Sequence, residues 1–196
     1  MIKAGITGNM GSGKSTVAKI FGALKIPVYH ADDEAKKFLD TPGVMARLQA
    51  TFGSSVVKGN KVDRKALAAI VFNDDQKLKE LNNIIHPLVK EDYNRWCENH
   101  KDFPYTLQEA AILVESGFYR LMDRVIVVSA PEEVRISRII ERDGATRQEV
   151  LSRMKNQYSE SQLRVHADFV IDNGGSKLVI PQVLDIHDKL MKSGRG

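Results

Sequence analysis

The sequence is poor in cysteine and in long apolar runs. Cys97 is the only cysteine among 196 residues, so the chain cannot close an internal disulfide, and we expect a protein of the reducing cytoplasm. No apolar stretch approaches the roughly 20 residues that a membrane-spanning helix requires. The sequence therefore predicts no membrane partner.

Aromatic residues and an excess of one charge are also scarce. Aromatic side chains make up 7% of the chain and do not interleave with basic clusters, as they do in many RNA-binding proteins. The net charge of +4 is too small to indicate a nucleic-acid partner, although it suits a small anionic ligand. With 42% hydrophobic and 28% charged residues, the composition is that of an ordinary globular domain.

A glycine-rich segment near the start of the chain is the strongest functional signal. Residues 8–15 read G-N-M-G-S-G-K-S, follow the apolar run Ile2–Ile6 and lead into helical spacing, which is the context of a phosphate-binding P-loop. Such a pattern arises by chance in roughly 1 in 100 chains of this length. Glycines let several N–H groups converge on one phosphate, while Lys14 reaches the β- and γ-phosphates and Ser15 can ligate Mg²⁺. The residues expected to bind ATP here are Gly8, Asn9, Met10, Gly11, Ser12, Gly13, Lys14, Ser15 and Thr16.

Apolar, β-branched runs separated by helical patterns predict an α/β fold, a P-loop NTPase-type five-stranded parallel sheet with helices on both faces. The predicted strands are Ile2–Ile6, Ile26–Tyr29, Tyr105–Leu107, Arg124–Ser129 and Asp168–Asp172. The long stretch between the second and third strands is helical by pattern, with predicted helices over 44–52 and 63–72 and an apolar stripe from Leu78 to Trp96. His86-Pro87 predicts a kink or a fresh helix starting at Pro87.

The predicted organisation is a single P-loop kinase domain over 1–196. Its nucleotide-binding core comprises 1–30, 104–141 and 166–196, and an inserted all-helical lobe over 31–103 would hold the acceptor substrate. Helices are predicted over 131–142, with Ser129 and Glu132 spaced as a capping box, from Thr146 with Glu149 as its box partner, and over 176–192. A helical lid over 142–165 completes the prediction.

Arginines on the helix over 131–142 support the lid. Arg135, Arg138 and Arg142 are spaced i, i+3 and i+7, and Arg147 follows across a turn, an arrangement that suits closure over phosphates. A solvated surface helix can show the same spacing.

Phosphoryl transfer also calls for a carboxylate near the acceptor hydroxyl. Asp32 follows the second predicted strand, at the sheet edge where ligands of open α/β folds bind, although it can equally be a helix N-cap. Asp33 and Glu34 are expected to be first-turn charges. Glu109 is expected to help hold Mg²⁺ through water, and Glu115 to contact substrate. The histidines lack metal-ligand spacing, so most are expected to be packed or exposed, with His86 a candidate substrate contact.

Two short motifs are typical of GTPases. Asp40-Thr41-Pro42-Gly43 matches D-x-x-G, and Asn60-Lys61-Val62-Asp63 matches N-K-x-D. The residues before Asp40 have helical spacing and two lysines rather than a buried-strand pattern. The segment between the two motifs is also too short for a crossover and a parallel strand. A nucleotide-dependent switch protein is therefore the least favoured function.

The chain resembles the dephospho-CoA kinase family along nearly its whole length. The resemblance is carried by Gly5-Ile6-Thr7-Gly8, Gly11-Ser12-Gly13-Lys14-Ser15-Thr16, Ala31-Asp32, Pro42-Gly43, His86-Pro87, Ile112-Leu113-Val114-Glu115, Arg142, Gln157 and Ala167-Asp168-Phe169-Val170-Ile171-Asp172-Asn173. It implies ATP-dependent phosphorylation of the ribose 3′-hydroxyl of dephospho-CoA, the last step of coenzyme A biosynthesis, with ATP and dephospho-CoA as the partners. Asp32 is then the general base, Lys14 and Arg142 stabilise charge, Asn173 contacts adenine, and Asp32, His86, Glu115 and Arg147 bind substrate.

Several positions depart from the family pattern. The acidic pair D-A-D reads His30-Ala31-Asp32, Ala111 replaces a proline, and Glu109 stands where aspartate is frequent. These departures leave the triphosphate site intact and affect mainly the substrate contacts. A P-loop kinase acting on another small alcohol or a nucleoside monophosphate remains the alternative.

Overall fold

The computed structural model describes residues 1–71, 74–155 and 157–194, and these form two compact units, Met1–His30 with Asn99–Gly196, and Ala31–Glu98. The first unit contains a five-stranded parallel sheet in the order β2-β5-β1-β6-β7. Its strands are β1 (Ile2–Thr7), β2 (Val28–His30), β5 (Tyr105–Glu109), β6 (Arg124–Ser129) and β7 (Phe169–Asp172). The predicted α/β class and the five parallel strands are confirmed.

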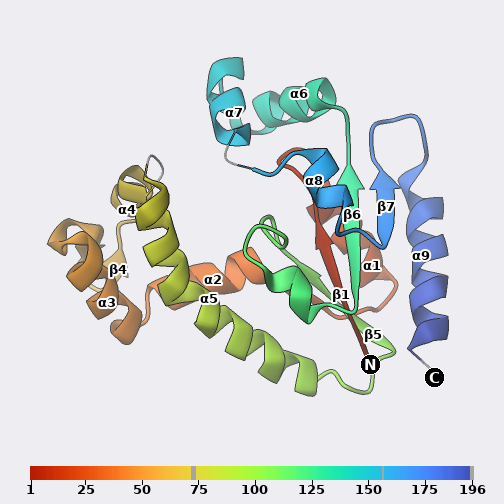
Figure 1. Ribbon diagram of the computed structural model, residues 1–196, viewed down its shortest axis with the longest axis horizontal. Helices are drawn as coiled ribbons and strands as arrows, with labels where there is room; N and C mark the ends of the chain where they lie inside the picture. Colours follow the sequence, from red (N-terminus) through yellow and green to blue (C-terminus); the bar gives the residue numbers. More distant parts are fainter. Residues whose placement is uncertain (72–73, 156, 195–196) are drawn as a thin grey trace. The chain divides into compact units, whose positions relative to one another are not determined.

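Helices complete the first unit, and Figure 1 shows α6 and α7 beyond the carboxyl ends of the strands. The helices are α1 (Lys14–Ala23), η2 (Phe118–Leu121), α6 (Glu132–Asp143), α7 (Arg147–Met154), α8 (Glu160–Arg164) and α9 (Val179–Ser193). The predicted capping box of Ser129 and Glu132 is wrong, because Pro131 caps α6 and the Ser129 hydroxyl donates to Glu160 Oε1 at 2.7 Å. The box of Thr146 and Glu149 on α7 is confirmed.

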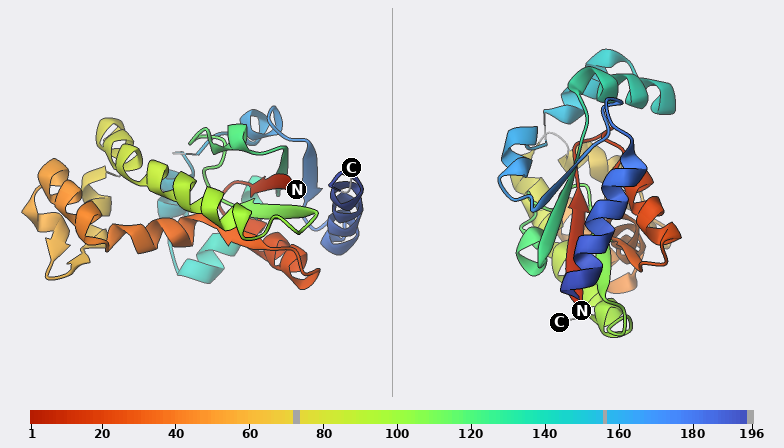
Figure 2. Two further views of the ribbon diagram at one scale, coloured as in Figure 1. Left: turned by 90° about the horizontal axis from the view of Figure 1, so that it is seen from below. Right: turned by 90° about the vertical axis from the view of Figure 1, so that its right-hand side faces the viewer.

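Helices α1 and α9 pack on one face of the sheet, and α9 stands in front of it in the right-hand view of Figure 2. Alternate strand residues point toward these helices because side chains alternate across a strand. Ile6, Leu107 and Val128 are among those that meet Phe21 of α1 and Ile186 of α9 in one buried cluster. Because a short loop joins β1 to α1, the amino end of α1 follows closely on the carboxyl end of β1.

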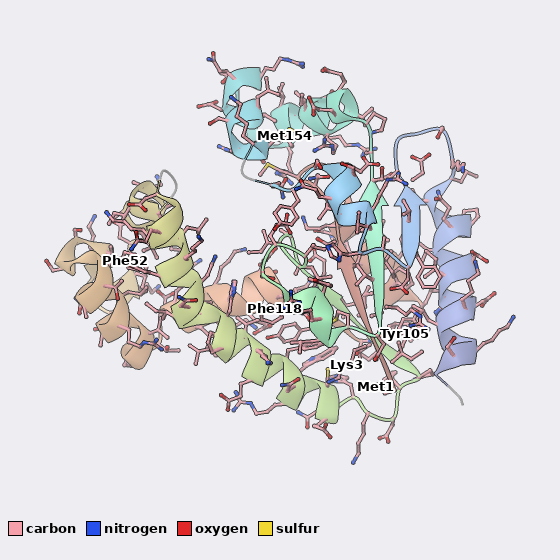
Figure 3. All side chains as sticks on the ribbon, viewed as in Figure 1. Met1, Lys3, Phe52, Tyr105, Phe118 and Met154 are labelled. Carbon is pink, nitrogen blue, oxygen red and sulfur yellow. The ribbon has the colours of Figure 1, made fainter. Side chains whose placement is uncertain are left out.

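Tyr105, labelled in Figure 3, lies in this cluster at the amino end of β5. Its hydroxyl lies 2.7 Å from His187 Nδ1, and its ring meets Phe21 edge-on with centroids 6.4 Å apart. Burial raises the pKa of the Tyr105 phenol far above its usual value, so the group stays neutral at physiological pH.

Loss of this hydroxyl is expected to cost much less than loss of the ring. Tyr105→Phe should lower the free energy of unfolding by about 1 kcal/mol, the net value of one hydrogen bond, and leave turnover unchanged. Tyr105→Ala should lower it by about 3–5 kcal/mol because it opens a cavity in the core. Urea unfolding of both variants measures the difference, and equal losses would contradict the described packing.

The described residues of the second unit form four helices, a short 3₁₀ turn and a small hairpin. Its elements are α2 (Ala31–Leu39), α3 (Pro42–Phe52), η1 (Ser54–Val56), β3 (Val57–Lys58), β4 (Lys61–Val62), α4 (Arg64–Val71) and α5 (Asp75–Glu98). Helix α5 packs along α2, as the left-hand view of Figure 2 shows. The predicted end of the fourth helix at Phe72 lies outside the described residues.

Two details of this unit correct the sequence-based expectations. The inserted segment is not all helical, because β3 and β4 form an antiparallel hairpin in which Gly59 adopts φ 59° in the turn. No fresh helix starts at Pro87, since α5 runs through it from Asp75 to Glu98. Tertiary packing of α5 outweighs the hydrogen bond that the proline removes.

The two GTPase-like motifs lie in the same unit, and neither follows a strand of a parallel sheet. Asp40 follows helix α2 rather than a strand, and Asn60 lies in the turn between β3 and β4. Both motifs are therefore matches of sequence alone. Among the helices of the described residues, none is long and apolar enough to cross a bilayer.

Candidate active site

The glycine-rich segment connects β1 to α1 as the sequence predicts. It turns tightly, with the Ser12 amide donating to the Asn9 carbonyl at 3.0 Å, and Gly13 in the left-handed region caps α1. Lys14 and Ser15 are the first two residues of the helix. The loop therefore places backbone amides, a helix amino terminus and the Lys14 ammonium group together, which is an anion-binding arrangement.

Gly11 and Gly13 are required by both conformation and space. Their φ angles are 80° and 92°, which side chains rarely adopt. A Cβ on Gly11 would lie 2.6 Å from the Arg135 carbonyl oxygen, and a Cβ on Gly13 would collide with the Asn173 side-chain amide. The loop is thus pressed closely against α6 and the segment after β7.

Gly11→Ala is expected to deform the loop, since the backbone of α6 cannot yield. We expect nucleotide affinity to fall at least tenfold and the free energy of unfolding to drop by about 1–3 kcal/mol, the usual cost of such strain. Calorimetric titration with ATP and urea unfolding measure the two effects. Gly43→Ala is the matched control, because nothing lies within 4 Å of a Cβ there and φ is ordinary. Equal behaviour of the two variants would contradict the proposed role of the loop.

Arg138 and Asn173 support the loop from outside. Arg138 donates to the Gly11 carbonyl at 3.4 Å and to the Asn173 carbonyl at 2.9 Å, while Asn173 Nδ2 donates to the Ser12 carbonyl at 2.7 Å. Arg135 is buried and donates to the Ala130 carbonyl at 3.1 Å. Two of the three aligned arginines therefore have structural contacts, and the adenine contact predicted for Asn173 stays a prediction.

Ser15, Glu109 and His30 form a chain of hydrogen bonds at the carboxyl ends of β2 and β5. The Ser15 hydroxyl donates to Glu109 Oε1 at 2.8 Å, and Glu109 Oε2 lies 2.8 Å from His30 Nδ1. Glu109 is buried. His30 is therefore part of the candidate site, contrary to the expectation of a merely packed or exposed imidazole.

The donor set of this corner fits magnesium. Ser15 and Glu109 present hard oxygen atoms at the amino end of α1, and Mg²⁺ in nucleotide sites binds few protein groups and keeps substrate phosphates and waters as its other ligands. Within the described ranges there is no cluster of three or more His, Cys, Asp or Glu side chains suited to a metal. A self-contained protein metal cage is thus not what the described residues offer.

Lys14, Arg138 and Arg142 line a cavity of about 190 Å³ against the glycine loop. Arg142 binds the neighbouring Asp143 through two hydrogen bonds of 2.7 and 3.1 Å, and this contact lowers the pKa of the Asp143 carboxyl. Three cationic side chains around one small cavity favour a polyphosphate.

The segment after α7 contacts the glycine loop directly. The Met10 amide donates to Gln157 Oε1 at 2.8 Å, and Asn9 Nδ2 donates to the Tyr158 carbonyl at 2.7 Å. Met10 also packs with Met154, which is labelled in Figure 3, against the buried cluster of Ile136, Ile139 and Val150. The segment predicted to form the lid is therefore connected to the glycine-rich loop.

The remaining predicted site residues belong to other segments of the chain. Asp32 falls inside the first turn of α2 with Asp33 and Glu34, so the N-cap alternative for Asp32 is wrong and the first-turn expectation for the other two is confirmed.

Partial burial lowers the pKa of His86 on α5, so its imidazole is neutral at pH 7. Arg147 forms a paired salt bridge with Glu133, with distances of 2.6 and 2.8 Å.

Glu115 has an incomplete set of partners. Its Oε1 accepts from the Tyr158 amide at 3.3 Å, whereas Oε2 is buried and has no hydrogen-bond partner among the described residues. A buried carboxylate oxygen without a partner is costly, so it favours a ligand or water at that position.

Sequence reasoning missed three contributors to the site. It assigned His30 no role in the site, it named Arg138 only as one of the aligned arginines on the helix over 131–142, and it named Gln157 only among the residues that carry the family resemblance. The pairing of β2 with β5 places His30 beside Glu109, which lies 79 residues later in the chain. No local sequence pattern indicates this pairing. Of these three residues, only Arg138 had a signal in the sequence, namely its helical spacing from Arg142.

A parallel sheet with a phosphate loop after β1, a lysine at the amino end of α1 and cationic side chains around the cavity define a P-loop nucleotide-binding kinase fold. The family model for dephospho-CoA kinase matches residues 2–178. The chain belongs to the dephospho-CoA kinase family.

Individual relatives agree. A dephospho-CoA kinase from Bacteroides fragilis is 39% identical over 187 residues, covering 94% of this chain and 91% of that protein. A crystal structure of a Thermus thermophilus protein superposes with a TM-score of 0.84 at 34% identity, covering 96% of both chains. Dephospho-CoA kinase from Campylobacter jejuni superposes with a TM-score of 0.71 at 26% identity, covering 97% of both chains.

Proposed function

We propose that this enzyme transfers the γ-phosphoryl group of ATP to the ribose 3′-hydroxyl of dephospho-CoA, giving coenzyme A and ADP. The observation that carries the proposal is the family match over residues 2–178, which spans both compact units and not the phosphate loop alone. The free thiol of Cys97 suits the reducing cytoplasm, where we expect the enzyme to work.

The donor is bound by the glycine loop. Backbone amides over 8–16 and the Lys14 ammonium bind the β- and γ-phosphates, while Arg142 offsets charge that develops as the γ-phosphoryl moves. Ser15, together with Glu109 through water, would hold a magnesium ion, which neutralises phosphate charge. Asn173 contacts the adenine in addition to supporting the loop through Ser12.

The acceptor is activated by Asp32. Its carboxylate accepts the proton of the 3′-hydroxyl as that oxygen forms a bond to the γ-phosphorus, and the bond from phosphorus to the β-phosphate oxygen breaks to release ADP. Residues 31–103 bind dephospho-CoA with His86 as one contact. Glu115 and Arg147 complete the substrate contacts, and Glu115 offers the buried oxygen described above.

Residues 142–165 act as the lid. Closure brings Arg142 to the phosphates. Its hydrogen bonds to Asp143 are then replaced by hydrogen bonds to oxygen atoms of the substrate. The contacts from Gln157 and Tyr158 to Met10 and Asn9 connect this movement to the loop. Exclusion of water from the closed site protects the phosphoryl group from hydrolysis.

An assay of ADP release against a panel of acceptors tests the proposal. The panel contains dephospho-CoA, adenosine, nucleoside monophosphates and shikimate, each at saturating Mg-ATP. Dephospho-CoA is expected to give a kcat/KM at least about 10³-fold above the others, the ratio that a hydrogen-bonding site can reach by rejecting poorly matched acceptors. Faster turnover of another acceptor, with dephospho-CoA inert, would refute the assignment.

A further inference from the structure

His30 is the residue of the site whose role neither the family match nor the sequence explains. It is the last residue of β2, directly paired with Glu109 at the end of β5. The two side chains meet at 2.8 Å, and their exposed fractions are 42% for His30 and 9% for Glu109. The partly exposed imidazole thus contacts a nearly buried carboxylate.

The chemistry of the three groups fixes the direction of each hydrogen bond. A carboxylate only accepts, so the Ser15 hydroxyl donates its hydrogen to Oε1 and His30 donates from Nδ1 to Oε2. Both Glu109 oxygens are then held, and the carboxylate cannot rotate without breaking one of the two bonds. With its hydrogen committed to Glu109, Ser15 Oγ retains its lone pairs for a cation.

We propose that His30 is a positioning residue for the cation that accompanies the triphosphate. By holding Glu109 Oε2, it fixes the carboxylate that orients the Ser15 hydroxyl, so both oxygen groups are arranged before the cation binds. This inference rests on the proposed function only in that the bound nucleotide is a Mg-triphosphate. In other metal sites, residues that hydrogen-bond to the metal ligands orient those ligands in the same way.

His30→Ala removes the donor while leaving the glycine loop and Lys14 in place. We expect the affinity for ATP in EDTA to change less than twofold, because the loop amides bind phosphate without His30. The Mg²⁺ concentration that half-saturates ATP binding should rise about tenfold, the lower range for loss of an outer-shell partner. Calorimetric titration of ATP at a series of Mg²⁺ concentrations measures both values without any acceptor.

Two further variants separate positioning from general structure. His30→Asn keeps an N–H near the position of Nδ1 and should restore the Mg²⁺ dependence to within about threefold of the original, whereas His30→Gln places its amide further out and should not. His166→Ala is the control histidine, since its ring packs on Tyr119 with centroids 4.4 Å apart. It should leave both affinities unchanged.

The imidazole itself provides a measurement on the unaltered protein. Long-range ¹⁵N–¹H NMR correlations of His30 should show hydrogen on Nδ1. A bare Nδ1 would overturn the inference, as would a His30→Ala protein with the original Mg²⁺ dependence or one that loses metal-free ATP affinity equally. If the protein binds Mg-ATP but leaves dephospho-CoA unphosphorylated, the proposed function fails while this test still applies.

Discussion

Lys14→Ala is expected to lower kcat/KM for ATP by about 10³-fold or more. The Lys14 ammonium lies at the amino end of α1 and lines the cavity against the glycine loop, so its loss removes a positive charge where the transferring phosphoryl group needs one. Removal of a single charge-stabilising donor from such sites costs 10²–10³-fold or more in turnover. Steady-state kinetics at saturating dephospho-CoA measure the effect.

Lys19→Ala is the matched control, since Lys19 is an exposed lysine further along the same helix. It removes the same charge and the same number of atoms, and we expect less than a twofold change. If Lys14→Ala also stays within tenfold of the original enzyme, the phosphate loop is not the donor site.

Asp32→Asn is expected to reduce kcat by about 10²–10⁴-fold while the Kd for ATP changes less than twofold. Asparagine has nearly the same shape but cannot accept the proton of the 3′-hydroxyl, and general base catalysis is worth that range. Rapid-quench measurement of the chemical step, together with calorimetric ATP binding, separates chemistry from affinity.

Asp33→Asn provides the comparison for this experiment. Asp33 lies in the same first turn of α2 but is exposed and pairs with Lys36 at 2.8 Å. Its loss should change kcat less than threefold, because an exposed ion pair contributes little. Comparable losses in the two variants would indicate a general electrostatic effect of the turn and would remove Asp32 from the role of base.

Local patterns were sufficient for much of the fold. The apolar runs predicted all five strands of the sheet, with errors of a few residues at their ends, as for the second strand, predicted over Ile26–Tyr29 and observed over Val28–His30. The P-loop was predictable because its glycines, lysine and serine are close together in the sequence and form one local motif. The capping box of Thr146 and Glu149 is equally local and was predicted correctly.

Features that depend on distant segments were not predictable in this way. The contact of His30 with Glu109 requires that β2 and β5 be neighbours in the sheet. The hydrogen bond from Met10 to Gln157 joins residues 147 positions apart. The Ser129 box is absent because α6 begins at Glu132 with Pro131 as its N-cap, and the Ser129 hydroxyl donates to Glu160 of the distant α8. Helix α5 runs through Pro87 because packing along its length outweighs a local preference.

The position of the new phosphate on the product tests the central claim most directly. The enzyme is incubated with Mg-ATP and dephospho-CoA, and a ³¹P–¹H correlation spectrum of the purified product is recorded. The account predicts one new phosphomonoester signal coupled to the ribose H3′, formed in equal amount with ADP. A phosphate coupled to any other proton, or ADP formed with inorganic phosphate and unchanged dephospho-CoA, would contradict it.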